Sequence, residues 1–378
     1  MKLLFLSSDR KIFDTESAVS SRMEKYASLV DTLTVMVFTK SSHEKKREIR
    51  GNLFLIPTNS KSRWSYIFDA ISIGKKLSGI DLISAQDPFE SGLTALYLAR
   101  KLNAKLEIQI HTDFLSPYFS KESLLNRVRV SIARYTLPKA DGVRVVSRRI
   151  VHSLQKKGTW TKRPPVVLPV YGDLSKYKNA SRGEFLKEKY PQFDFHVLVA
   201  SRLSPEKNLS AVFKDFAKAM EKFPKMGLIV VGDGEQKESL HGLAKKLGAK
   251  ESIIFEGWIN DLSPYFLSAD LFVSASFYEG FGLSLLEAAS SGCSILSTDV
   301  GIVGDILKPE HLFLSGFKEE EIYSTLLSAL QEEERRISSQ SFLREDVSSF
   351  LALDQEEYFQ KFILNWKSLL EANTESSL

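Results

Sequence analysis

Two glutamates, Glu279 and Glu287, stand eight residues apart in the sequence Glu-Gly-Phe-Gly-Leu-Ser-Leu-Leu-Glu. An apolar run at 271–274 precedes them and predicts a buried strand, so the pair follows the carboxyl end of that strand. This end is where open α/β sheets bind ligands. The intervening glycines let the backbone approach a ligand, and the helix expected from residue 283 offers unpaired N–H groups to an anion. A capping box from Ser284 to Glu287 is the structural alternative for Glu287, but it leaves Glu279 unexplained.

A second polar segment, Ser201 to Asn208, follows the apolar run 195–200 and so also lies at a strand end. Arg202 and Lys207 bracket a Ser-Pro-Glu turn before a helix that Asn208 would cap. Two cations at such a turn suit a diphosphate, with arginine as a fork and lysine as a point charge. The alternative is a solvated turn with a weak Arg–Glu pair.

Two further strand ends carry residues suited to a site. The run 228–231 leads into Gly232-Asp233-Gly234, but position 237 is lysine, so the third glycine of a dinucleotide fingerprint is missing. We therefore expect a tight turn beside a ligand and no NAD site. The strand 106–110 ends at His111, close to Asp113, where a histidine is either structural or faces the ligand crevice.

The composition narrows the class of protein. Cys293 is the only cysteine, which excludes an internal disulfide and a cysteine-based metal cluster. No spacing of His, Asp and Glu is typical of a metal site, so we expect none. No run of 18 apolar residues occurs, and the stretch at 3–6 is too short for a secretory signal and predicts a first strand. A reducing cytoplasm is the simplest location.

Charge divides the sequence into unlike halves. Residues 1–172 hold 29 basic and 15 acidic residues, a net charge of +14, and residues 173–378 hold 22 and 32, a net charge of −10. A basic half favours an anionic partner, although complementary surfaces within the protein would give the same pattern. Seven basic residues cluster around two expected helices and predict contact with an anionic membrane surface or a phosphate-bearing lipid acceptor: Lys121, Arg127, Arg129, Arg134, Arg144, Arg148 and Arg149. No aromatic-basic strand platform favours nucleic acid.

Short apolar runs alternate with helical patterns through both halves, which predicts two parallel sheets covered on both faces. Strands are expected at 3–6, 33–38, 53–56, 81–84, 106–110 and 143–146, and again at 195–200, 228–231, 253–255, 271–273, 295–298 and 312–314. Consecutive prolines at 164–165 indicate a linker at about 164–173. We therefore predict domains at 1–168 and 169–354. The tail, 355–378, carries an amphipathic helix with Phe359, Phe362, Ile363 and Trp366 on one face.

Together these segments resemble glycosyltransferase family 4 with the GT-B architecture. The resemblance covers most of the chain and is strongest in the C-terminal half. It rests on an ordered set of motifs: a G-R-L-x-x-x-K-N-like segment at 201–208, the G-x-G turn at 232–234, a V-x-F-x-G-x-V-like piece at 253–259, A-D-x-F-V-x-x-S at 269–276 and E-x7-E at 279–287. His111 matches the strand-end histidine of the family's N-terminal domain.

The resemblance implies a role for each matching residue. Arg202 and Lys207 would grip the donor diphosphate, and Glu287 would bond the ribose hydroxyls. His111 would reach the donor sugar from across a cleft between two Rossmann-like domains. The remaining donor contacts would come from Glu279, the loop and helix start at Gly280, Phe281, Gly282 and Leu283, and the base-binding backbone at Gly257, Trp258 and Ile259. The tail helix would cross back onto the N-terminal domain.

One segment departs from the family pattern. Many members carry a Gly-Gly loop after the first strand, which approaches the phosphates. Here residues 13–20, Phe-Asp-Thr-Glu-Ser-Ala-Val-Ser, contain no glycine, so the acceptor site is expected to be reorganised there.

The activity implied is a retaining transfer of sugar from a UDP- or GDP-linked donor, without a metal or other cofactor. The acceptor would be a carbohydrate or a lipid-linked or polysaccharide precursor in cell-envelope glycan synthesis, and the enzyme a cytoplasmic protein, peripheral on the inner face of the membrane. Fixed cations would stabilise the departing diphosphate, and the glycosidase mechanism with two carboxylates fits poorly. The alternatives are a sugar-nucleotide epimerase, a non-catalytic nucleotide-sugar-binding protein and a dinucleotide-dependent oxidoreductase.

Overall fold

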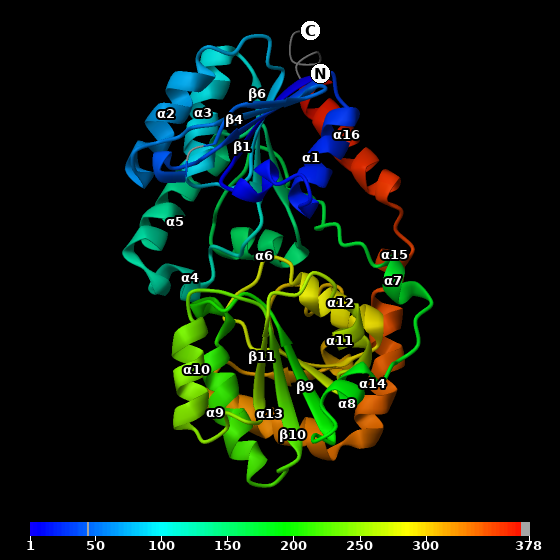
Figure 1. The fold of residues 1–378 in the computed structure, drawn as a ribbon. Helices are drawn as coiled ribbons and strands as arrows, with labels where there is room; N and C mark the ends of the chain where they lie inside the picture. Colours follow the sequence, from blue (N-terminus) through cyan, green and yellow to red (C-terminus); the bar gives the residue numbers. More distant parts are fainter. Residues whose placement is uncertain (44, 372–378) are drawn as a thin grey trace. The chain divides into compact units, whose positions relative to one another are not determined.

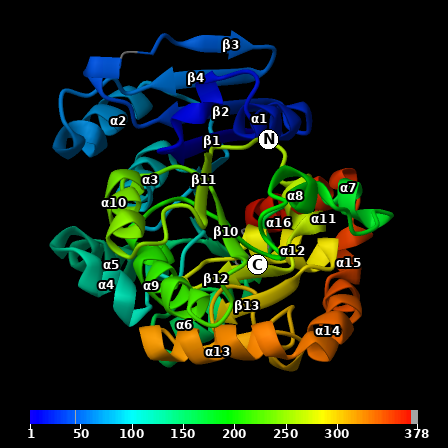
Figure 2. The same ribbon diagram turned by 60° about the horizontal axis from the view of Figure 1, so that its bottom comes forward.

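The computed structural model describes residues 1–43 and 45–371, which form two compact α/β units. Unit 1 comprises Met1–Pro169 and the segment that begins at Gln355, and unit 2 comprises Val170–Asp354. Both units are built around a sheet with helices on each side (Figures 1 and 2). The predicted architecture of two Rossmann-like units is confirmed.

Unit 1 contains an eight-stranded sheet in the order β3-β4-β2-β1-β5-β6-β7-β8. The strands are β1 Lys2–Ser7, β2 Thr32–Val37, β3 Glu48–Arg50, β4 Leu53–Pro57, β5 Leu82–Ala85, β6 Lys105–Ile110, β7 Gly142–Val145 and β8 Val166–Val167. All neighbours are parallel except β3, which pairs antiparallel with β4 at one edge. Strands β3 and β8 were not predicted from the sequence, and β8 extends the sheet into the segment expected to be a linker.

The helices of unit 1 connect these strands and cover both faces of the sheet. They are α1 Ala18–Ser28, α2 Tyr66–Gly74, α3 Glu90–Leu102, α4 Pro117–Glu122, α5 Leu124–Thr136, α6 Arg148–Lys156 and α16 Gln355–Glu371. The unit also contains short 3-10 segments, among them η1 Arg10–Phe13, η3 Arg63–Ser65 and η4 Leu137–Lys139. Helices α2, α3 and α5 lie on one side of the sheet, with α1 and α16 on the other (Figure 1).

The tail helix α16 packs on unit 1 through an aromatic cluster. Trp366 is fully buried, and its ring lies 5.7 Å from Phe5 of β1 and 5.5 Å from Tyr26 of α1. Phe359 and Phe362 also contact Tyr26. The apolar face predicted for the tail is therefore the face that docks on the N-terminal sheet.

Unit 2 contains a six-stranded parallel sheet in the order β11-β10-β9-β12-β13-β14. The strands are β9 Phe195–Ala200, β10 Met226–Val231, β11 Ile253–Gly257, β12 Leu271–Ser274, β13 Ser294–Thr298 and β14 Phe313–Ser315. The helices are α7 Ser175–Lys178, α8 Phe185–Lys189, α9 Leu209–Met220, α10 Lys237–Lys246, α11 Ser263–Ser268, α12 Leu283–Ser291, α13 Glu319–Gln331, α14 Glu333–Asp346 and α15 Ser348–Leu351, with 3-10 segment η5 at Pro205–Lys207. The strand interiors are buried apolar runs, as expected of a sheet covered on both faces.

Candidate active site

The strand order of unit 2 reverses between β9 and β12, which places a crevice at their carboxyl ends. The chain passes from β9 outward to β10 and β11, then returns to β12 and moves outward to β13 and β14. Strands β9 and β12 pair only through Leu271–Val197 and Phe272–Leu198, so the loops after both strands flank the switch point. Ligands of open α/β sheets bind at such a position.

An ion pair spans this switch point. Lys207, at the end of the loop after β9, donates through Nζ to Glu279 Oε1 at 2.5 Å, and Ser276 Oγ donates to the same oxygen at 2.9 Å. Both charged side chains are mostly buried. The structure therefore brings together two predicted site residues that lie 72 positions apart in the sequence.

Arg202 occupies the start of the same loop and faces solvent. Its guanidinium lies 3.2 Å from Glu206 Oε1, and its side chain is 74% exposed. This is the Arg–Glu pair that the sequence offered as the structural alternative, and an exposed pair of this kind contributes little to stability. An arginine so weakly held is able to reorient toward an anion.

Hydrogen bonds join the ends of neighbouring strands and the loops that follow them along this edge of the sheet. Gly232 N donates to Gly257 O at 2.7 Å, Leu203 N donates to Asp233 O at 2.9 Å, and Thr298 Oγ1 donates to Ser276 O at 2.7 Å. The close approach requires glycine at position 232, where φ is +138° and an added Cβ would lie 1.9 Å from Ser201 O. Together with the Lys207–Glu279 pair, these bonds connect the carboxyl ends of five strands, β9 to β13.

Helix α12 begins at the glycine-rich loop without a side-chain cap. Its N-cap is Gly282, in the left-handed conformation, and no side chain accepts a hydrogen bond from the first turn in the described structure. The capping box proposed for Ser284 and Glu287 is therefore wrong, because Ser284 already lies inside the helix. A helix start capped only by glycine suits an anion.

The helix cap predicted at Asn208 is confirmed in position but not in its side-chain contact. Asn208 stands at the N-cap position of α9, as expected, but its side chain does not cap the helix. Its Nδ2 instead donates to Phe317 O at 3.2 Å and so links the loop after β9 to the loop after β14.

Glu287 faces helix α7, a neighbour that the sequence did not predict. Burial raises the pKa of Glu287 to about 7; Lys176 opposes this rise and Asp261 adds to it. The hydroxyl of Tyr177 lies close enough to influence that pKa, yet it is buried and has no hydrogen-bond partner among the described residues. A carboxyl pKa raised by burial is typical of functional sites, so Glu287 and the neighbouring Tyr177 hydroxyl are candidates to bind a polar ligand.

The segment predicted to receive the base lies at the end of β11. Gly257 has φ +72°, and no atom lies within 4 Å of the position that a Cβ would take. Trp258 is exposed and donates from Nε1 to Asn260 Oδ1 at 3.0 Å. The space beside the α-carbon of Gly257 is therefore empty of other protein atoms.

His111 belongs to unit 1, where it follows β6. Its Nε2 lies 3.1 Å from Gln109 Oε1. Desolvation and the nearby cations Arg144 and Arg22 lower the pKa of His111; because the residue is exposed to solvent, the two cations are the firmer cause. A neighbouring guanidinium disfavours the imidazolium, which favours the neutral ring at physiological pH.

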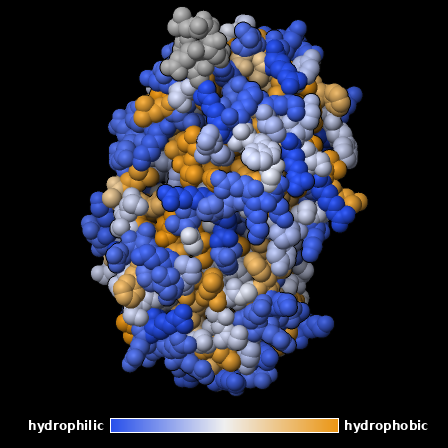
Figure 3. All heavy atoms as spheres, turned by 180° about the vertical axis from the view of Figure 1, so that it is seen from behind, coloured by the Kyte–Doolittle hydropathy of each residue, from blue (hydrophilic) through white to orange (hydrophobic). Residues whose placement is uncertain are grey.

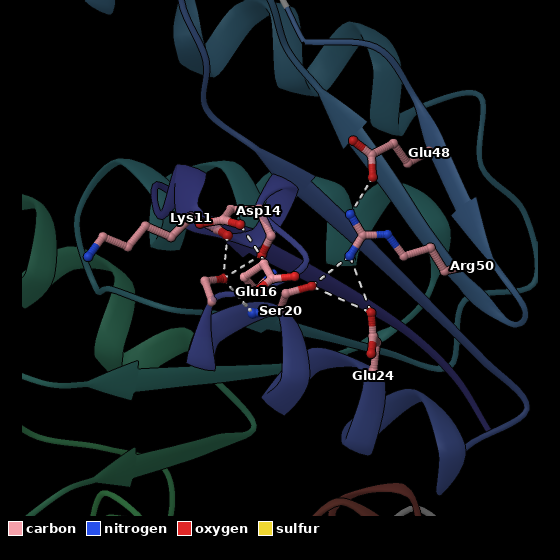
Figure 4. Close-up of polar contacts among 8 residues, drawn as sticks. Lys11, Asp14, Glu16, Ser20, Glu24, Glu48 and Arg50 are labelled. Atoms are coloured by element: carbon pink, nitrogen blue, oxygen red, sulfur yellow. Dashed lines mark hydrogen bonds and ion pairs between the residues drawn. The ribbon is translucent and has the colours of Figure 1, made fainter. Parts of the chain in front are cut away.

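The loop after β1 is built by side chains where the family pattern has glycines (Figure 4). The single hydroxyl hydrogen of Ser17 is shared between Lys11 O, 2.6 Å from Oγ, and Asp14 O, 2.7 Å from Oγ, and Oγ accepts from Ser20 N as the cap of α1. Glu16 N donates to Asp14 Oδ1. These bonds fix the turn, and its carboxylates make it an unfavourable neighbour for phosphate.

Arg50 ties this loop's helix to the edge of the sheet. Its Nη1 donates to Ser20 Oγ at 2.6 Å and lies 3.3 Å from Glu24, and its Nη2 pairs with Glu48 (Figure 4). The antiparallel strand β3 that carries Arg50 and Glu48 thus has a structural role in holding α1.

Within the described residues, no group of three or more His, Cys, Asp or Glu side chains could hold a metal ion. Sequence reasoning also missed two residues of the candidate sites, Tyr177 and Gln109. Tyr177 lies in a helix of four residues, which is too short to give a periodic signal. Gln109 could have been found from its residue type, because a glutamine inside a buried parallel strand is unusual.

Comparison with known proteins agrees with this geometry. Residues 184–341 match the family described as Glycosyl transferases group 1, and residues 30–169 match Glycosyltransferase Family 4. The alpha-monoglucosyldiacylglycerol synthase of Streptococcus pneumoniae is 28% identical over 78% of this chain and 70% of its own length.

Solved structures share the fold. Sucrose-phosphate synthase from Thermosynechococcus elongatus gives a TM-score of 0.79 at 18% identity, over 98% of this chain and all of the other. Anabaena HepE in complex with UDP gives a TM-score of 0.71 at 19% identity, with both chains fully covered.

Proposed function

Because this chain is a family 4-like glycosyltransferase with the GT-B fold, we propose that it transfers a sugar from a UDP- or GDP-linked donor with retention of anomeric configuration. The observation that carries the proposal is the Lys207–Glu279 pair at the β9–β12 switch point. It joins a cation suited to the diphosphate with a carboxylate suited to the donor sugar, at the place where this fold binds ligands.

Negative charge grows on the departing diphosphate as the anomeric carbon becomes cationic. Lys207, the reorienting Arg202 and the glycine-capped start of α12 direct positive charge and N–H groups toward that group. Their interaction strengthens as the charge develops, so they stabilise the transition state more than the ground state. In this proposal these cations take the role that a divalent metal has in other sugar transferases.

The two glutamates have different tasks. Glu279, held by Lys207 and Ser276, orients the donor sugar together with the loop at Gly280 and Phe281. Glu287, beside Tyr177, accepts hydrogen bonds from the ribose hydroxyls. The two carboxylates therefore do not act as an acid–base pair, and the leaving phosphate takes the proton of the acceptor.

The similar proteins suggest the kinds of substrate. HepE has been solved with UDP, and the pneumococcal relative is named as a synthase of a glucosylated diacylglycerol. These names favour a UDP-sugar donor and an acceptor in lipid-linked or polysaccharide precursors of the cell envelope.

Steady-state kinetics on three variants test the proposal: Lys207→Ala, Arg202→Ala and Glu287→Gln. Lys214→Ala is the matched control, because Lys214 also forms an ion pair, with Glu319, but on α9 away from the switch point. Lys207→Ala should lower kcat/KM about 100-fold or more, as expected for loss of a charge that stabilises the transition state. Near-normal transfer by all three variants would refute the assignment, and interconversion of the nucleotide-sugar without transfer would identify an epimerase.

A specific surface supports docking on an anionic membrane as a second function. Helix α5 exposes Leu124, Leu125 and Val128 beside Arg127 and the more distal Arg134, and Leu124 is 75% exposed. Next to it, α3 and α5 line a pocket of about 410 Å³ with Leu93, Leu96, Tyr97, Arg100, Lys101 and Tyr135. Apolar side chains with interspersed cations suit the interface of an anionic bilayer.

The structure also corrects the basic cluster predicted from the sequence. Arg144 is buried and donates to Gln109, Leu168 and Pro169, so it cannot meet a membrane. Arg129 pairs with Glu90. Helices in the described chain are too short or too polar to span a bilayer, and hydrophilic residues cover most of the face shown in Figure 3, with apolar residues in smaller groups.

Sedimentation with liposomes tests this docking. Arg127→Glu combined with Arg134→Glu should weaken binding to anionic vesicles about 30-fold or more, since each basic residue near the surface contributes about 1 kcal/mol. Lys245→Glu combined with Lys246→Glu on α10 is the control, because it changes the same amount of charge on an exposed helix of unit 2. Equal binding of the wild type to anionic and neutral vesicles would contradict the proposal.

A further inference from the structure

A line of polar side chains runs along the buried face of β6 toward His111. Glu107 and Gln109 alternate along β6 and so share one face of the strand, and His111 follows just past its end. Glu107 and Gln109 are almost wholly buried. Polar groups at such positions lower stability unless every one is hydrogen-bonded. The hydrogen-bond partners of these side chains therefore determine how each side chain is oriented.

Glu107 is satisfied mainly by the tail helix. Asn365 Nδ2 donates to its Oε1 at 2.7 Å, and Trp366 Nε1 donates to its Oε2 at 3.1 Å. Ser84 Oγ of β5 donates to the same Oε2 at 2.7 Å. One end of the polar line is therefore a carboxylate held by α16.

The amide of Gln109 has only one chemically possible orientation. Its Nε2 donates to Ser84 Oγ at 2.9 Å and to Glu107 Oε2 at 3.2 Å. Its Oε1 accepts from Arg144 Nη1 at 2.7 Å, and a guanidinium can only donate. Rotating the amide by 180° would set its NH₂ against the guanidinium and its oxygen against the carboxylate.

This orientation determines the proton on His111. Its Nε2 lies 3.1 Å from Gln109 Oε1, an oxygen that cannot donate, so Nε2 must carry the hydrogen. The neutral ring then presents Nδ1 as an acceptor. In the described chain no hydrogen bond occupies Nδ1, so it is available to a hydroxyl group of a substrate.

We propose that Gln109, oriented by Arg144 and Glu107, is a positioning residue that holds His111 as the Nε2-protonated tautomer with Nδ1 directed to accept from a sugar hydroxyl. This inference rests on the proposed glycosyl transfer for its catalytic consequence, but not for the tautomer itself. Arg144 also donates to the carbonyls of Leu168 and Pro169, the last residues of unit 1 before the chain enters unit 2. The same guanidinium stacks on Phe362 of α16 at 4.5 Å. Arg144 is therefore held in place by contacts with β6, with residues 168–169 and with α16.

Long-range ¹⁵N–¹H NMR of the full chain reads the tautomer directly, with the His111 signal assigned by its loss in His111→Asn. The wild type should show a protonated Nε2 and an unprotonated Nδ1 at neutral pH. In Gln109→Met, which keeps the volume but loses the acceptor, the ring should become a mixture of tautomers. Asn365→Ala is the control: it removes a bond to Glu107 of the same buried network and should leave the tautomer unchanged.

Kinetics supply the second readout. Gln109→Met should lower kcat about ten-fold or more while KM for the donor changes by less than about three-fold, because a misoriented ring affects the reaction more than ground-state binding. Asn365→Ala should lower thermal stability without that split between kcat and KM. A wild-type ring protonated at Nδ1, a Gln109→Met tautomer equal to wild type, or an unchanged kcat in that variant would each overturn the proposal. A wild type that fails to transfer sugar would refute the proposed function alone, since the NMR result needs no substrate.

Discussion

Both units have a largely parallel sheet between helices, but the carboxyl edges of the two sheets are built differently. In unit 2 the edge is formed by backbone and glycine, with Gly232 and Gly282 in left-handed conformations and the Lys207–Glu279 pair at the switch point. In unit 1 the corresponding edge is formed by side chains, namely the Ser17-centred loop and the buried line from Glu107 to His111. A backbone edge suits the close approach of a diphosphate, whereas a side-chain edge suits orientation of hydroxyl groups.

The largest expected loss of stability comes from Trp366, through which helix α16 supports Glu107 in the unit 1 sheet. Trp366→Ala should lower the free energy of unfolding by about 3–5 kcal/mol, because it removes a fully buried indole and one partner of Glu107. Chemical denaturation measures this change. Leu364→Ala is the control, since that neighbouring side chain is 64% exposed; equal losses in both variants would contradict the role assigned to α16.

A single substitution, at Gly232, should disrupt the carboxyl edge of the unit 2 sheet. Gly232→Ala forces a side chain into φ +138° and against Ser201 O, so we expect a loss of about 2–4 kcal/mol in the stability of unit 2 and loss of donor binding. Gly242→Ala is the matched control, because no atom lies within 4 Å of its Cβ position and it is in helix α10. A Gly232→Ala variant that unfolds and binds like Gly242→Ala would show that the backbone contact is dispensable.

The strands of both units could be predicted from the sequence more fully than the edges of the sheets. All twelve predicted strands are present, because each is a short apolar run bounded by turn residues. Strands β3 and β8 were missed because they have three and two residues and lie at sheet edges. Periodicity in α14, Glu333–Asp346, is weak, and four of its first residues are charged, so that helix was also missed.

The site was predicted in its residues but not in its partners. Motif spacing gave Lys207 and Glu279, and strand order brings them together. The sequence could not show that Tyr177 lies beside Glu287, because only tertiary packing joins α7 to α12. It also placed Arg144 on the surface, since arginine is rarely buried; here three backbone and amide carbonyl groups satisfy its guanidinium.

The ionised carboxylate of Glu287 should lower the stability of unit 2 even though it is the form proposed to bind the donor. Its folded pKa, about 7, is above the usual value, so between about pH 4.5 and 7 the folded protein holds more protons than the unfolded chain. Stability contributed by the protonated group is therefore lost as pH rises through 7. Glu287→Gln should raise the free energy of unfolding at pH 8 by about 1–3 kcal/mol and have little effect at pH 4. A Gln variant less stable than wild type at pH 8 would contradict the burial argument.

The same ionisation should control donor binding. If the carboxylate of Glu287 accepts from ribose hydroxyls, the affinity for the donor rises as pH increases through about 7 in the wild type. Calorimetric titrations from pH 6 to pH 8 measure this trend. Glu287→Gln should bind weakly with no such trend; a trend that persists in that variant would assign it to another group.

The smallest expected effect tests the loop in unit 1. Ser17→Ala removes the cap of α1 and the hydroxyl donor shared by the carbonyls of Lys11 and Asp14, so stability should fall by about 1 kcal/mol. Ser28→Ala, at the exposed end of the same helix, should change it by less than about 0.5 kcal/mol. Thermal unfolding measures both changes. Equal stability of the two variants would show that the side chain of Ser17 does not fix the loop.

The central claim is that the switch point of unit 2 holds the diphosphate of a nucleotide-sugar. Calorimetric binding of UDP and GDP to wild type, Lys207→Ala and Lys214→Ala tests it without any knowledge of the acceptor. We predict that one nucleotide binds the wild type and Lys214→Ala equally and binds Lys207→Ala at least about ten-fold more weakly, a change of about 1.4 kcal/mol. Equal affinity of the same nucleotide for all three proteins would contradict the account.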